Sequence, residues 1–145
     1  MNSFYELGLL PTLQATLDAQ RITRPTEIQA RAMPELLAGR SVVGVAETGS
    51  GKTLAYALPI LHKIKSLEDS GSPVTAESAP RAVVLVPSRE LGEQVARVFK
   101  TFTHDTRLRV RMALGGVDLL KSRENVKGAF EVLVATPGRL GQLVE

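Results

Sequence analysis

The residues best suited to chemistry form a glycine-rich octet that follows a short apolar run. Gly49 and Gly51 would let the backbone turn closely enough for several N–H groups to face one anion. A helix beginning near Lys52 would add the positive end of its dipole, with Lys52 reaching phosphates and the Thr53 hydroxyl binding Mg²⁺. The octet consists of Ala46, Glu47, Thr48, Gly49, Ser50, Gly51, Lys52 and Thr53. We therefore predict a phosphate-binding loop, the plainer alternative being a turn with a solvated lysine.

Length and composition limit the possible classes of protein. The chain has 145 residues, of which 43% are apolar, enough for one core but not for two full domains. The absence of cysteine excludes disulfides and favours a reducing, cytoplasmic setting. We find no secretory signal and no apolar run long enough to span a membrane. A net charge of +3 weakly favours anionic partners.

The elements that must position the loop alternate between strands and helices. Short apolar runs predict buried strands at residues 42–46, 82–86 and 132–135. Helical apolar spacing predicts helices at residues 10–17, 26–32, 52–66 with a bend at Pro59, 88–102 and, weakly, 117–126, with a further turn starting at Pro34. The polar stretch 66–80 is expected to be a mobile surface loop. This order predicts an α/β domain with a mostly parallel sheet.

Residues 107–114 have a different pattern. Arg107, Arg109 and Arg111 alternate with apolar residues, so one face of a strand would be basic. Strands buried on both faces do not show this alternation, which favours an edge strand. We interpret the arginine row as a solvated, aggregation-resistant edge rather than as a nucleic-acid stripe. His62 and His104 lack metal-ligand neighbours and are expected at the surface.

Five short motifs occur in the order and spacing of a known family. They are residues 24–29 with Phe4 upstream, the octet 46–53, residues 87–91, the pair 115–116 and residues 136–139. Together they closely resemble the first part of the N-terminal RecA-like domain of DEAD-box RNA helicases, in which Ala46 is a usual first residue of the loop. The resemblance covers the whole chain. It implies an incomplete RecA-like P-loop NTPase fold, with a Q-motif region at 1–37 and a P-loop region at 42–145.

The resemblance also implies ATP or ADP with Mg²⁺ as cofactors. Gln29 would read the adenine edge and Phe4 would stack on the purine, and Arg21 and Ile22 depart from the usual residues of that motif. The residues alone leave alternatives open: Thr26 and Gln29 fit a capping box, and Phe4 fits a staple for the first helix. The implied nucleotide contacts are Phe4, Arg24, Thr26, Gln29, Thr48, Gly49, Ser50, Gly51, Lys52 and Thr53.

A second set of residues lies where predicted strands end and helices begin. The carboxyl ends of strands in an open α/β sheet form a binding rim, and helix N-termini and arginines there suit successive phosphates. The resemblance implies sequence-nonspecific binding of single-stranded or duplex RNA through Pro87, Ser88, Arg89, Gly115, Gly116, Thr136, Pro137, Gly138 and Arg139. Ser88 and Thr136 also fit helix N-caps. Ser88 and Gly92 depart conservatively from the family pattern.

The acidic Asp-Glu-Ala-Asp motif of the family is missing from this chain, which contains no Asp-Glu dipeptide. Hydrolysis needs carboxylates for Mg²⁺ and water, and arginines from a second RecA-like domain. We therefore expect a piece of a helicase that binds nucleotide without hydrolysing it, partnered by the rest of that protein and exposing unpaired strand edges. The alternative is a non-hydrolytic P-loop interaction module. A small-molecule kinase is disfavoured by the two strand-end motifs.

Overall fold

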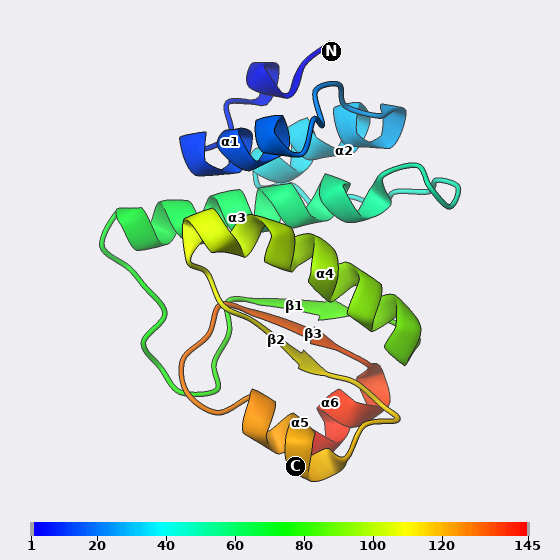
Figure 1. Cartoon of the computed structure of the whole chain (residues 1–145), viewed down its shortest axis with the longest axis vertical. Coiled ribbons are helices and arrows are strands. Elements are labelled where there is room, and N and C mark those ends of the chain that lie inside the picture. The colour runs from blue at the N-terminus through cyan, green and yellow to red at the C-terminus, as the bar shows by residue number, and fades with distance from the viewer. Residues whose placement is uncertain (1, 145) are drawn as a thin grey trace. The chain divides into compact units, whose positions relative to one another are not determined.

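The computed structural model describes residues 2–144 and divides the chain into two compact units, Met1–Leu67 and Glu68–Glu145. The first unit is helical and the second contains the sheet (Figure 1). The boundary falls near the end of helix α3 (Lys52–Asp69). The motif regions 1–37 and 42–145 remain predictions.

Short helices with apolar faces build the first unit. The chain runs through η1 (Phe4–Leu7), α1 (Pro11–Ala19), α2 (Glu27–Leu37) and α3. Pro11 suits the first turn of α1, where its missing N–H removes no helical hydrogen bond. Side chains without exposed surface form the core of this unit: Phe4, Leu13, Leu17, Met33, Leu58 and Leu61. The predicted helix at residues 10–17 is therefore confirmed within one residue at its start.

Two predictions for the first unit are wrong. Pro34 lies inside a continuous α2 instead of starting a separate turn. Proline lacks one backbone N–H donor, and the helix continues despite the loss of that one hydrogen bond. Residues 42–46 form no strand. A strand needs a neighbour for its backbone groups, and no strand of the described chain pairs with this segment. Val43 and Val45 are consequently 95% and 91% exposed.

The second unit is built on a three-stranded parallel sheet in the order β1-β3-β2. The strands are β1 (Ala82–Leu85), β2 (Val110–Ala113) and β3 (Val132–Ala135). Helix α4 (Arg89–Thr106) covers one face, and α5 (Leu119–Asn125) and α6 (Pro137–Val144) cover the other (Figure 1). The central strand β3 is buried throughout. The mostly parallel α/β sheet is confirmed for this unit.

Strand β1 lies at one edge of this sheet and is less buried than predicted. Val83 and Leu85 are 48% and 56% exposed, because alternate side chains on an edge strand can leave one face uncovered. Helix α4 starts as predicted but continues to Thr106, and Arg107 ends it in the left-handed conformation (φ 60°). The apolar face of α4 packs against β2 and β3.

Strand β2 forms the other edge, as its arginine alternation predicted. The interpretation of Arg109 as a simply solvated residue is wrong. Its guanidinium donates to Glu131 Oε2 at 2.6 Å, and its backbone N–H donates to Glu131 Oε1 at 2.6 Å. The Glu131 side chain is only 2% exposed. Burial alone would raise the pKa of Glu131, but the hydrogen bonds and charge of Arg109 outweigh it and hold that pKa below its ordinary value.

The connection between α3 and β1 begins later than predicted, because α3 continues through Asp69. It is also held at several points rather than free of contacts. The Ser78 backbone N–H donates to Gly128 O at 2.8 Å, and its hydroxyl donates to Val126 O at 2.6 Å. Val74 is buried, and its carbonyl accepts from Arg109.

Candidate nucleotide site and strand-end groove

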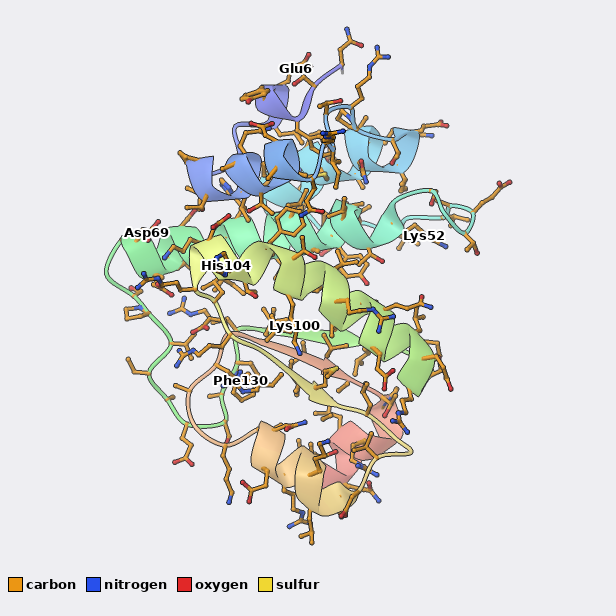
Figure 2. The ribbon with its side chains drawn as sticks, in the orientation of Figure 1. Glu6, Lys52, Asp69, Lys100, His104 and Phe130 are labelled. Carbon is orange, nitrogen blue, oxygen red and sulfur yellow. The ribbon has the colours of Figure 1, made fainter. Side chains whose placement is uncertain are left out.

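The phosphate loop leads directly into α3, which begins at Lys52. Gly49 and Gly51 have φ of 82° and 86°, a region that favours glycine, so the loop has the predicted turn chemistry. Lys52 lies at the end of α3 that the loop enters (Figure 2). Its Nζ donates to Ala46 O at 2.7 Å, which holds the ammonium over the loop. The loop therefore combines a helix N-terminus with a lysine cation, as anion binding requires.

Gln29 connects the start of α2 with this loop. Its Oε1 accepts from Thr26 N at 2.9 Å, which completes the predicted capping box, and its Nε2 donates to Gly51 O at 3.1 Å. A Cβ at position 51 would collide with Gln29 Nε2, so glycine is required there for space as well as conformation. Gln29 is 2% exposed. Its amide retains a lone pair and a hydrogen that these two bonds do not use.

A cavity of about 760 Å³ lies beside the loop within the first unit. Its walls come from the first turns of α2, residues 42–47 and Ser50. The Ser50 hydroxyl is the one buried side-chain oxygen of the described residues with no hydrogen-bond partner. Of the predicted nucleotide contacts, Thr26 and Ser50 line this cavity, whereas Gln29 and Lys52 do not.

The structure places other predicted nucleotide residues less favourably. Phe4 has no exposed surface, so it offers no ring face to a purine, and its burial agrees with the staple alternative. Arg24 is exposed. His62 was predicted at the surface but is half-buried. Its Nδ1 accepts a hydrogen bond from Leu10 N at 3.2 Å, and burial lowers its pKa. His104 is exposed, as predicted.

The residues present supply few ligands for Mg²⁺. Thr53 offers a hydroxyl, which also hydrogen-bonds Tyr56; burial raises the pKa of Tyr56, and this bond partly offsets the rise. Across residues 2–144, no group of three or more His, Asp or Glu side chains could hold a metal ion. Mg²⁺ prefers six oxygen ligands, often including waters and substrate phosphates. Thr53 alone therefore fits the ion as one ligand beside nucleotide oxygens.

The second unit has a groove of about 530 Å³ at the carboxyl ends of its strands. Eight of the nine residues predicted for nucleic acid line it, and the groove brings together all three strand-end motifs. Its lining is Pro87, Ser88, Arg89, Gly115, Thr136, Pro137, Gly138, Arg139 and Gln142. Gly116 lies next to it, and its carbonyl accepts from Arg89 at 3.2 Å. Sequence reasoning missed Gln142, which no motif marks.

Hydrogen bonds between the strand ends organise this groove. Ser88 caps α4, since its hydroxyl accepts from Leu91 N at 3.3 Å, which confirms the N-cap prediction. The Thr136 hydroxyl accepts from Gly115 N at 2.8 Å. This bond ties the end of β3 to the end of β2, a role that the capping interpretation of Thr136 did not include. The N-termini of α4 and α6 thus open on one rim.

Two arginines bring positive charge to the groove. Arg89 is half-exposed and is held by Glu93 Oε1 at 3.0 Å as well as by Gly116 O. Arg139 donates through Nε to Gln142 Oε1 at 2.8 Å and through Nη1 to Ser122 Oγ at 2.7 Å. Helix N-termini with adjacent guanidinium groups suit a chain of phosphates.

Packing explains the glycine at position 92. A Cβ there would lie 2.5 Å from Leu114 Cδ2 and 3.1 Å from Val86 Cγ2, so a larger residue would have to displace the side chains that follow β2 and β1. This departure from the family pattern therefore lies at a tightly packed position of α4.

The glycine turn before α3 and the parallel sheet with a phosphate-suited rim define a RecA-like, P-loop α/β protein. Comparison with known families agrees: the profile of the DEAD/DEAH box helicase family matches residues 26–145. The chain belongs to this family. Within it, the chain corresponds to the first part of the N-terminal RecA-like domain.

Individual relatives support the assignment. The chain is 40% identical over 145 residues to DEAD-box ATP-dependent RNA helicase 39 of Arabidopsis thaliana, covering 100% of this chain and 23% of that protein. It is 38% identical over 140 residues to the ATP-dependent rRNA helicase RRP3 of Lodderomyces elongisporus, covering 97% and 26%. The chain thus spans about a quarter of the length of these relatives.

A solved structure supports the fold. The RNA helicase Prp28 of Chaetomium thermophilum, determined bound to ADP, matches with a TM-score of 0.85 and 33% identity, covering 99% of this chain and 34% of that one. In the described part of the present chain, no helix is both long and apolar enough to cross a membrane.

Proposed function

We propose that this chain binds ATP and ADP through its phosphate loop and RNA through its strand-end groove, as part of an ATP-dependent RNA helicase. The observation that carries the proposal is the loop itself. Two left-handed glycines lead into the start of α3, and Lys52, its first residue, holds its Nζ 2.7 Å from Ala46 O of the same loop, a combination that suits anion binding. Hydrolysis and duplex remodelling are proposed only for a longer protein with the acidic motif and a second RecA-like domain.

Nucleotide phosphates would replace the contact that Lys52 makes with Ala46 O. The backbone N–H groups of residues 48–53 and the ammonium then face the β- and γ-phosphates. Thr53 would hold Mg²⁺, which when bound neutralises phosphate charge. Gln29 would use its remaining amide lone pair and hydrogen for adenine while still bridging Thr26 and Gly51.

The base preference provides the first test. We expect Gln29→Ala to weaken ADP binding by roughly 10-fold while GDP binding stays as poor as in the unaltered chain, because about two hydrogen bonds to adenine are lost. Gln14→Ala is the matched control, since Gln14 is a buried amide on α1 in the same unit. Fluorescent ADP and GDP titrations measure both affinities. A lower melting temperature with an unchanged preference for ADP would leave only the capping role of Gln29.

The groove is proposed to bind the backbone of RNA, with little sequence preference. Ser88 and Thr136 fix the strand ends, so that Arg89, Arg139 and the two helix N-termini face successive phosphates. Contacts to 2′-hydroxyls would favour RNA over DNA.

Charge removal tests the groove. Arg89→Ala and Arg139→Ala should each weaken binding of single-stranded RNA by roughly 3- to 10-fold, because each loses a phosphate contact. Each should also reduce by about 0.7 the slope of the logarithm of the binding constant against the logarithm of the salt concentration. Arg97→Ala on the exposed side of α4 is the control. Fluorescence anisotropy with labelled oligouridine measures both quantities, and equal losses in all three variants would contradict a specific groove.

A further inference from the structure

Arg139 is held from two sides by residues outside the motifs. On one side Ser122 Oγ of α5 accepts from Nη1 at 2.7 Å, and on the other Gln142 Oε1 of α6 accepts from Nε at 2.8 Å. Gln142 is exposed and lines the groove, whereas Ser122 is 1% exposed and is not part of the lining. Arginine has more N–H donors than these two contacts use, so the remaining donors stay available to an anion.

The support for Ser122 itself is rigid. Asn125, one turn later on α5, donates through Nδ2 to Met112 O at 3.1 Å and so attaches this helix to β2. The Ser122 backbone N–H donates to Asp118 O at 3.1 Å, and Asp118 caps the helix. A buried hydroxyl on an anchored helix defines a fixed point for the guanidinium, which an exposed side chain alone would not have.

We propose that Ser122 and Gln142 are positioning residues that preset the Arg139 guanidinium for an RNA phosphate. The inference rests on the proposed function of the groove. A free arginine loses rotamer freedom when it binds phosphate, whereas a guanidinium already held in place loses less. Because the planar fork of arginine recognises phosphate by direction as well as charge, its orientation matters for affinity.

The geometry predicts a specific pattern of coupling. Ser122→Ala and Gln142→Ala should each weaken single-stranded RNA binding by roughly 3- to 10-fold. In the Arg139→Ala background neither substitution should have a further effect, since the side chain that they position is gone. In the Arg89→Ala background their effects should remain full, because Arg89 is held separately by Glu93 and Gly116.

The experiment is a pair of double-mutant cycles on the full 145-residue chain, with labelled oligouridine and anisotropy as the readout. Melting temperatures accompany each variant, and exposed Gln142 tests the idea even if Ser122→Ala unfolds. Coupling to Arg139 alone supports the proposal, whereas equal coupling to Arg89 means general loosening of the groove and overturns it. If Arg139→Ala weakens binding but Ser122→Ala and Gln142→Ala do not, positioning is refuted and RNA binding stands. If Arg139→Ala itself has no effect, both the RNA contact of this arginine and the positioning role of Ser122 and Gln142 are refuted.

Discussion

Lys52→Ala is expected to weaken ADP binding by about 10- to 100-fold, the largest effect on ligand binding that this chain should show. Hydrogen bonds to charged groups contribute about 1.5–3 kcal/mol, and tenfold in affinity corresponds to about 1.4 kcal/mol. In the free chain Lys52 Nζ already contacts Ala46 O, so binding exchanges one partner for another. The net loss should therefore fall toward the lower end of this range.

The matched control for Lys52 is Lys63→Ala, an exposed lysine further along α3. Titration of labelled ADP into each variant gives the two affinities, and melting temperatures should stay close because both side chains are exposed. Equal affinities of Lys52→Ala and Lys63→Ala would exclude a phosphate contact by Lys52.

Arg109→Met is expected to lower the free energy of unfolding by about 2–3 kcal/mol. The substitution leaves the Glu131 carboxylate buried without its cation, and breaking a buried pair from one side typically costs about 3–5 kcal/mol. Arg109 is itself 42% exposed, so its charge is partly solvated and the loss should be smaller than that range. Urea denaturation followed by circular dichroism measures the change.

Arg111→Met is the control for this prediction, because Arg111, on β2 two residues after Arg109, acts on Glu131 through its charge alone and should change stability by less than about 1 kcal/mol.

The pairing of Arg109 with Glu131 also predicts a pH effect. The folded pKa of Glu131 is below its ordinary value of 4.5, so its stabilisation is complete above that pH and is lost as the pH falls through the folded pKa. In Arg109→Met, the free energy of unfolding should fall less steeply as the pH is lowered through this range. An unchanged pH dependence would contradict the role assigned to the pair.

Local patterns predicted much of this structure. The position of β3 and the cap at Ser88 follow from a short apolar run and from one hydroxyl before a helix. The glycine turn before Lys52 follows from residue types that tolerate positive φ. The groove residues were predicted because they belong to motifs that resemble those of the family, and the ends of strands in a parallel sheet meet at one rim.

The features that sequence reasoning missed depend on contacts between distant segments. Residues 42–46 have a good strand pattern, yet pattern alone does not supply a hydrogen-bonded neighbour. The pairing of Arg109 with Glu131 joins the residues that immediately precede β2 and β3, and alternation along one segment could not reveal it. Gln142 and Ser122 belong to no motif, and only the fold brings them to Arg139.

The strand order β1-β3-β2 has a consequence for how this unit assembles during synthesis. Within residues 2–144, both edge strands bond only to β3, which is the last of the three along the chain. Until residues 132–135 leave the ribosome, β1 and β2 therefore have no native partner for their backbone groups. The sheet must form late and in one cooperative step, and a nascent chain arrested before Val132 would carry two unpaired strands open to misassociation.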